Sequence, residues 1–193
     1  MVKEEKMKLL NKKVMEEYSH EKIVLGHGDL NSSIILIGEA PGAKEIEMGE
    51  PFVGQAGKHF GEFLEVLNIK RENVYITNSV KYRPTKINPK TKRLSNRTPT
   101  SREIDAFRRY IYEEIDIIKP SIIVTLGNTP LKAIFNDDLK IGEVHGKIME
   151  VKIQDENYRI FPLYHPAAII YRRELKGTYM EDLIKLKKEI KNF

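Results

Sequence analysis

Short continuous runs of apolar residues alternate with amphipathic segments along this chain. Two of the runs, residues 33–37 and 121–126, are each followed by a glycine, and residues 74–78 and 159–164 read as two further strands. Runs that are apolar at every position, rather than at every second one, are typical of strands covered on both faces, as in a parallel sheet. The pattern therefore predicts a parallel sheet of four strands.

Amphipathic segments lie before, between and after these runs. Near the N-terminus, for example, Met7, Leu10 and Val14 recur at helical spacing among charged residues. The pattern predicts helices at residues 3–18, 57–67, 101–118 and 179–191. Strands that alternate with helices favour an α/β fold, here a three-layer α/β/α sandwich around the central four-stranded parallel sheet.

The composition narrows the kind of protein. A length of 193 residues predicts one domain, over residues 1–193. The net charge of +5 favours a polyanionic partner such as a nucleic acid, although a solvated basic surface explains it as well. No apolar run reaches the roughly 20 residues that span a bilayer, and the N-terminus is charged throughout. We therefore expect a cytoplasmic monomer that makes no contact with a membrane.

The chain has no cysteine, which excludes disulfides, thiolate catalysis and iron–sulfur ligation by cysteine. It also lacks the P-loop, the G-x-G-x-x-G dinucleotide motif, the G-x-S-x-G nucleophile elbow and the H-E-x-x-H metal motif. These absences argue against phosphoryl transfer, dinucleotide chemistry, serine hydrolysis and a metal site.

Residues 84–101 form a long polar stretch without periodicity. Its cations are Lys86, Lys90, Lys92, Arg93 and Arg97. We interpret the stretch as a basic surface loop, which either contacts a nucleic acid or is simply a solvated insertion.

Polar residues follow three of the predicted strands, where α/β proteins gather their ligands. Glu39 follows the first strand within the segment Gly38-Glu39-Ala40-Pro41-Gly42, and Asn78 ends the second. The Asn78 amide offers both donors and an acceptor to a planar ligand. His165 follows the last strand and precedes a proline, and a histidine held there can donate a hydrogen bond to a developing anion. Taken singly, each of these residues is also explained by an ordinary turn, cap or structural role, and a lone Asn after a strand more often has such a role.

Four segments, taken together and in order, resemble the family 4 uracil-DNA glycosylases. They are residues 38–42, 51–57 (Pro-Phe-Val-Gly-Gln-Ala-Gly), 74–84 and 165–167 (His-Pro-Ala), and the resemblance extends over about residues 34–186. It implies an enzyme of DNA repair that flips uracil out of the helix and hydrolyses its N-glycosidic bond, leaving an abasic site.

The resemblance also implies roles for individual residues. Phe52 matches the aromatic platform that stacks on the flipped base, and Asn78 matches the amide that reads the base edge. His165 matches the histidine that hydrogen-bonds uracil O2 as negative charge develops. Glu39 and Glu45 match two acidic residues of the first loop, with roles in positioning water, stabilising the cationic sugar or shaping the pocket against the methyl group of thymine.

Further residues of the same motifs are expected to contact substrate. Ala40 belongs to the predicted base pocket. Residues 168–173 match the loop that enters the duplex as the base leaves, so that Arg172 and Arg173 would contact phosphates. Lys81 and Arg83, in the motif that follows Asn78, are expected to bind DNA as well.

The chain departs from the family at the four cysteines that usually hold a [4Fe–4S] cluster. Tyr82 stands at one cysteine position and Phe107 at another, and the N-terminal pair is absent. We therefore expect no cofactor, and an aromatic cluster in which Tyr82 and Phe107 lie close together and fill the space by apolar burial.

Two alternatives stay open. The same pocket could accept another deaminated base, hypoxanthine or xanthine, because an amide can reverse its donor and acceptor. The chain could also be a binder of uracil-containing DNA without turnover, or one that traps it covalently. Trapping relatives carry a basic insertion that ends in a reactive histidine, and the insertion here, residues 85–95, has no histidine, which favours turnover.

Overall fold

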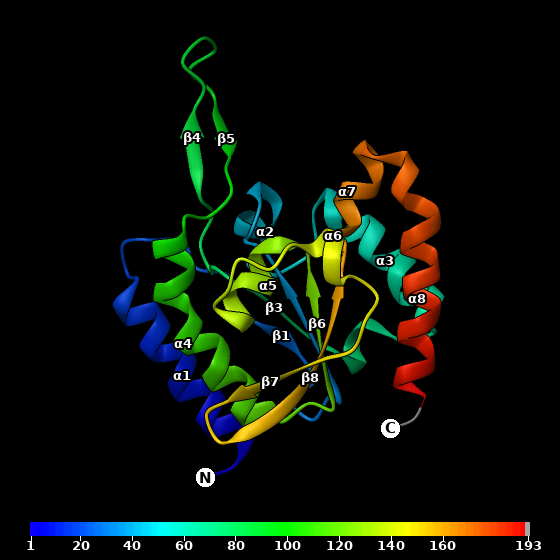
Figure 1. Cartoon of the computed structure of the whole chain (residues 1–193). Coiled ribbons are helices and arrows are strands. Elements are labelled where there is room, and N and C mark those ends of the chain that lie inside the picture. The colour runs from blue at the N-terminus through cyan, green and yellow to red at the C-terminus, as the bar shows by residue number, and fades with distance from the viewer. Residues whose placement is uncertain (192–193) are drawn as a thin grey trace.

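A twisted sheet forms the middle layer of the protein in a computed structural model, which describes residues 1–191 (Figure 1). Six strands of the described chain lie in the order β1-β3-β2-β6-β8-β7. The central four are parallel to one another, and they are β3 (Tyr75–Asn78), β2 (Ile34–Gly38), β6 (Ile122–Leu126) and β8 (Glu156–Leu163). The predicted four-stranded parallel sheet is therefore confirmed as the core of a larger, mixed sheet.

The two edge strands were not predicted. β1 (His27–Gly28) pairs antiparallel with β3, and β7 (Met149–Ile153) pairs antiparallel with β8. β1 has only two residues, and β7 is only partly buried and carries Glu150 and Lys152. Neither strand therefore shows the continuous apolar run that marks a strand covered on both faces.

Helices cover both faces of the sheet (Figure 1). One face carries α1 (Lys3–Glu17), α4 (Ser101–Ile118) and α5 (Asn128–Phe135), and the other carries α3 (Gln55–Leu67) and α8 (Lys176–Ile190). Within β2, Ile35 and Ile37 belong to the first apolar core, whereas Ile34 and Leu36 belong to the second. This alternation explains why every position of the strand is apolar.

Shorter helices connect these elements. They are α2 (Ala43–Met48), η1 (Arg71–Asn73), α6 (Ile141–Val144), α7 (Pro166–Tyr171) and η2 (Arg173–Leu175). None of the described helices is long and apolar enough to cross a membrane.

The four predicted helices are present, with boundaries that differ by up to three residues. α4 has the predicted ends because Thr100 and Glu103 form a capping box at its start and Lys119 ends it in the left-handed conformation. α3 begins at Gln55 and α8 at Lys176, two and three residues before the predicted starts at residues 57 and 179.

The sequence suggested that residues 84–101 form an irregular loop, but the structure shows regular pairing in this stretch. Its first part forms an antiparallel hairpin of β4 (Thr85–Ile87) and β5 (Leu94–Asn96), which stands away from the body of the protein (Figure 1). A hairpin of three paired residues per strand is too short for its alternation to stand out in a sequence.

The strand order fixes the place where a ligand would bind. From β2 the chain passes to β3 on one side of it, and later returns to β6 on the other side. Loops therefore diverge beyond the carboxyl end of β2, which in open α/β sheets opens a crevice for ligands.

Candidate active site

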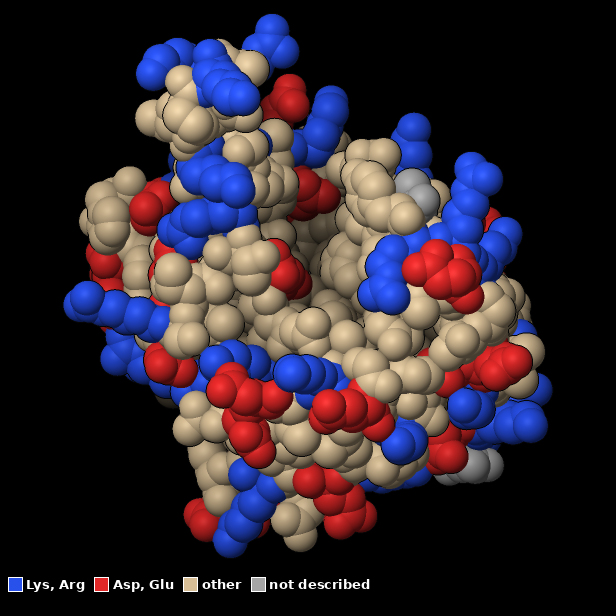
Figure 2. Space-filling view, turned by 45° about the horizontal axis from the view of Figure 1, so that its top comes forward, with Lys and Arg blue, Asp and Glu red and all other residues tan. Residues whose placement is uncertain are grey.

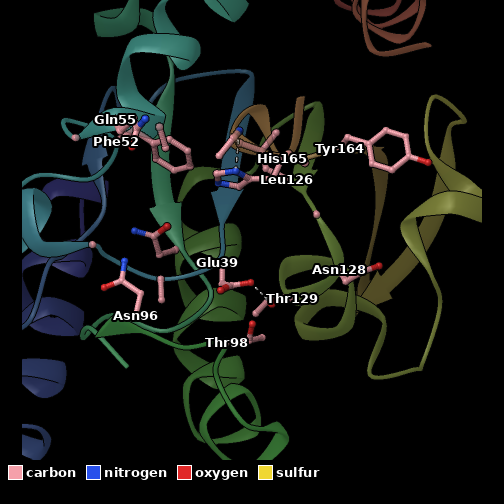
Figure 3. Close-up of a pocket in the computed structure, with 18 of the residues that line it drawn as sticks. Glu39, Phe52, Gln55, Asn96, Thr98, Leu126, Asn128, Thr129, Tyr164 and His165 are labelled. Atoms are coloured by element: carbon pink, nitrogen blue, oxygen red, sulfur yellow. Dashed lines mark hydrogen bonds between the residues drawn. The ribbon is translucent and has the colours of Figure 1, made fainter. Parts of the chain in front are cut away.

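A pocket of about 730 Å³ lies at this crevice, within the range of 300–1,000 Å³ that is usual for small-molecule sites. All four parallel strands contribute residues to its lining. Asn78 lies at the end of β3. Glu39 follows β2, Thr129 follows β6 and His165 follows β8 (Figure 3). The space-filling view shows the hollow from outside (Figure 2). The three strand ends predicted to carry the chemistry therefore meet in one pocket.

His165 caps the N-terminus of α7, and its ring is held in one tautomer. Its Nδ1 accepts a hydrogen bond from the backbone N–H of Ala167 at 3.1 Å (Figure 3). Burial lowers the pKa of His165 to about 4, so the ring is neutral near pH 7. A neutral ring whose Nδ1 is an acceptor carries its proton on Nε2. His165 can therefore offer one N–H to a ligand without being charged.

Phe52 forms a flat apolar wall of the pocket. Its ring is stacked at 25° to the His165 ring, with centroids 6.0 Å apart, and it packs on Phe60. The backbone of Phe52 has φ 53°, a strained value for an aromatic residue. Arg71 holds this backbone by donating to the carbonyl oxygens of Pro51 (2.5 Å) and Phe52 (3.3 Å). Arg71 was not predicted as part of the site.

Asn78 presents an unused amide to the pocket. It is 4% exposed, and its side chain makes no hydrogen bond to another described residue. Gly38 leaves room for it, because a Cβ at Gly38 would lie 2.5 Å from Asn78 Oδ1 and 2.6 Å from Phe52 Cζ. Because Asn78 lines the pocket, the donors and the acceptor of its amide are free to bind a ligand there.

Glu39 is oriented by a hydroxyl group. Thr129 Oγ1 donates to Glu39 Oε2 at 2.7 Å (Figure 3). Burial raises the pKa of Glu39, and the hydrogen bond from Thr129 partly opposes this by lowering it. Thr129 was missed in the sequence, although Gly127-Asn128-Thr129 directly follows a predicted strand, the same signal that singled out Glu39 and Asn78.

Glu45 lies at the pocket, but its carboxylate binds the backbone. It is 8% exposed and accepts hydrogen bonds from the N–H groups of Gly42 (3.2 Å) and Gly54 (2.7 Å). These bonds close the loop that leads from β2 to Phe52. Glu45 therefore braces the pocket wall, while the half-buried Ala40 lines the pocket beside it.

The prediction that Lys81 binds DNA is wrong. Its side chain is 1% exposed and forms an ion pair with Glu114, with both N–O distances 2.9 Å. It also donates to Thr77 Oγ1 at 2.7 Å, and Tyr75 donates to Glu114. Its ammonium group lies between the sheet and α4, where a phosphate cannot reach it.

The other three predicted DNA-binding residues lie near the rim of the pocket. Arg83 donates to Asn96 Oδ1 at 2.7 Å, and Asn96 lines the pocket. Arg172 and Arg173 are exposed directly after α7, and Arg172 pairs with Glu174 at 3.1 Å. Contact of these arginines with DNA stays a prediction.

The position of the predicted aromatic cluster is confirmed. The rings of Tyr82 and Phe107 lie 5.8 Å apart, and Tyr18 stacks on Phe107 at 4.3 Å. Tyr110 completes the group, 6.0 Å from Phe107. The residues here do not fit an iron–sulfur cluster, because the chain has no thiolate and these aromatic rings pack against one another. Within residues 1–191, no group of three or more His, Asp or Glu side chains could hold a metal ion.

The fold and the pocket define an α/β protein with a ligand-sized pocket at the carboxyl ends of its parallel strands. A family model described as the uracil DNA glycosylase superfamily matches residues 25–186. A type-4 uracil-DNA glycosylase of Archaeoglobus fulgidus is 39% identical over 84% of this chain and 79% of its own length. The type-4 enzyme of Sulfurisphaera tokodaii is 40% identical over 85% of this chain and 73% of its own length. That of Thermotoga maritima is 34% identical over 98% of this chain and 97% of its own length. The chain therefore belongs to the uracil-DNA glycosylase superfamily and, within it, to the type-4 family.

Proposed function

We propose that this protein excises uracil from DNA by hydrolysing the N-glycosidic bond, as the names of its relatives indicate for them. The observation that carries the proposal is His165, a neutral ring with a fixed Nε2–H donor that lies beside the Phe52 ring in the pocket. Such a donor suits a carbonyl oxygen that becomes negative as the base departs.

Each pocket residue has a part in binding the flipped base. The ring of Phe52 stacks on the base, and the free amide of Asn78 pairs with its polar edge. The Nε2–H of His165 donates to uracil O2. Glu45 contributes by holding the loop that carries Phe52 in place.

The reaction cleaves the N-glycosidic bond and adds one water molecule to the sugar. The bond between C1′ and N1 breaks, and its electron pair leaves with uracil, whose charge the hydrogen bond from His165 stabilises. A water molecule adds to C1′ and passes its proton to Glu39, which Thr129 orients. The uracil anion takes up a proton from solvent, and Glu39 releases to solvent the proton that it took from water, so that the carboxylate is restored. The products are free uracil and an abasic site.

Replacement of His165 tests this proposal. We expect His165→Ala to lower kcat by about 10²–10³, the usual cost of one donor to a developing oxyanion. The rate of uracil release is measured on single-stranded DNA and on U:G and U:A duplexes. His20→Ala, at an exposed histidine outside the pocket, is the control and should keep the wild-type rate. A normal rate for His165→Ala would refute the assignment.

The same assay separates the alternatives. Release of hypoxanthine or xanthine, without release of uracil, would show that the substrate is another deaminated base. A protein–DNA band that survives SDS would indicate covalent trapping, and binding without any product would indicate a non-catalytic binder.

We further propose that the enzyme works without an iron–sulfur cluster and as a monomer in the cytoplasm. The aromatic packing of Tyr82 and Phe107 supports the first point. The purified protein should show no visible iron–sulfur band and no stoichiometric iron. Light scattering should give a mass near 22.4 kDa.

A further inference from the structure

The β4–β5 hairpin is an ordered arm. Three cross-strand pairs join its strands, and the last of them, Ile87 with Leu94, pairs two exposed apolar side chains that support the register. At the tip, Asn88 accepts hydrogen bonds at Oδ1 from the N–H groups of Lys90 (2.9 Å) and Thr91 (3.1 Å). The arm is thus held in one shape by its own hydrogen bonds.

The base of the arm is fixed to the rim of the pocket. Arg97 donates to the carbonyl oxygen of Thr85 and forms two hydrogen bonds of 2.7 Å with Glu103, the capping residue of α4. Asn96, the last residue of β5, and Thr98 line the pocket itself. The arm therefore projects from the pocket edge in a direction that the body of the protein sets.

The charge of the arm is entirely positive. Residues 84–102 contain no Asp or Glu, and the hairpin carries the exposed cations Lys86, Lys90, Lys92 and Arg93. None of these four forms an ion pair with an acidic side chain among the residues that the structure describes. Figure 2 shows Lys and Arg side chains gathered on the arm, with further Lys and Arg beyond the hollow.

We propose that this arm binds the phosphates of DNA on one side of the flipped nucleotide. The inference rests on the proposed function, because it takes the pocket as the place of that nucleotide. Unpaired, exposed cations on a fixed support are suited to phosphates, since binding releases the counterions condensed on DNA. Phosphate contacts of this kind position a protein on DNA without reading sequence.

The length of the arm sets its reach. About five residues separate Asn96 from the tip, which at about 3.3 Å per residue gives roughly 17 Å. Along the duplex axis one strand advances about 3.4 Å per phosphate, so an arm that lies along this axis would reach about five nucleotides from the pocket. The contact should exist on one flank only, because the described chain carries one such arm.

Salt dependence of DNA binding tests the arm without requiring catalysis. The arm variant is Lys86→Gln, Lys90→Gln, Lys92→Gln and Arg93→Gln, and binding to an undamaged duplex is followed by fluorescence anisotropy. The slope of log K against log[salt] should become shallower by up to about 3.6, or about 0.9 for each phosphate that the variant no longer neutralises. The pair Lys90→Gln and Lys92→Gln alone should give about half of this change. These side chains extend into solvent, so the variants should melt like the wild type.

A charge-matched control removes the same number of cations elsewhere. Lys6, Lys8, Lys12 and Lys152 are exposed on α1 and β7, away from the arm (Figure 1), and their replacement by Gln should leave the slope nearly unchanged. An arm variant with the wild-type or control slope would overturn the proposal, and that result is also the one expected if the arm binds a protein instead.

Flank length gives the second measurement. Uracil release by the wild type should increase as one flank grows from two to about five nucleotides, and the arm variant should lack this increase. Equal flank dependence in both proteins would count against the arm. If the wild type releases no uracil from any substrate, the proposed function fails, whereas the salt slope still decides whether the arm binds DNA.

Discussion

Gly38 ends β2 at the point where the two base-facing side chains of the pocket approach the backbone. A Cβ here would overlap Asn78 Oδ1 and Phe52 Cζ. We expect Gly38→Ala to lower kcat/KM for uracil release by at least about tenfold, because a displacement of about 1 Å in a catalytic site can cost up to about 10²-fold. Steady-state kinetics on a uracil oligonucleotide measure it.

The control for this substitution is Gly61→Ala. Gly61 lies inside α3, and a Cβ there meets nothing within 4 Å. Alanine should leave activity unchanged and stabilise the protein by up to about 1 kcal/mol, because it favours the helix. If Gly38→Ala behaved like Gly61→Ala, close packing at Gly38 would have no part in the site.

Thr129 should control the acid side of the pH profile. Its hydrogen bond lowers the pKa of Glu39 against the rise that burial causes. Removing the donor in Thr129→Val raises that pKa further, so Glu39 becomes protonated at a higher pH. We expect the acid limb of kcat/KM against pH to move to higher pH. Thr129→Ser, which keeps the hydroxyl, should retain the wild-type limb. An unmoved limb in the valine variant would contradict this role.

The sequence predicted the site where polar residues directly follow apolar strands. Glu39, Asn78 and His165 meet in the pocket because parallel strands end at one edge of a sheet. Arg71 could not be found in this way, since it binds backbone carbonyl oxygens and no side-chain pattern marks such contacts. Lys81 was misassigned because the sequence does not show that Glu114 lies beside it.

The ion pair of Lys81 and Glu114 joins the segment after β3 to α4, and its burial makes it a structural contact. Lys81→Met would leave a buried carboxylate without its cation, which typically costs about 3–5 kcal/mol. The double variant Lys81→Met, Glu114→Gln should recover much of this stability. Urea unfolding measures both free energies.

An exposed ion pair supplies the comparison. Lys12 and Glu16 lie one helical turn apart on α1 with mostly exposed side chains, and Lys12→Met should change stability by less than about 0.5 kcal/mol. Equal effects of Lys12→Met and Lys81→Met would show that burial of the second pair has little energetic consequence.

Among the elements, the strands with a continuous apolar run were predicted, whereas the short edge strands and the hairpin were not. β2 is apolar at every position and β6 at every position but Thr125, because helices cover both of their faces. β7 alternates strictly between apolar and charged residues (Met149-Glu150-Val151-Lys152-Ile153), as strands with one solvated face do, and the prediction missed it because it relied on continuous apolar runs. The β4–β5 hairpin is set by pairing and by the anchors at its base.

The two apolar cores of the molecule share one sheet. The first core contains Ile35 and Ile123, and the second contains their chain neighbours Ile34 and Ile122. Removal of either helical layer would therefore expose one side of strands on which the other layer depends. This arrangement predicts that residues 1–193 unfold as the single domain that the sequence suggested.

Calorimetry measures this cooperativity. We expect one transition whose calorimetric enthalpy equals the van't Hoff enthalpy, with a value of about 130 kcal/mol near 60 °C from about 0.7 kcal/mol per residue. The arm variant is the matched control, because its substituted side chains extend into solvent and should not change the enthalpy. Two resolved transitions, or a van't Hoff enthalpy far below the calorimetric one, would show that the layers on the two faces of the sheet unfold separately.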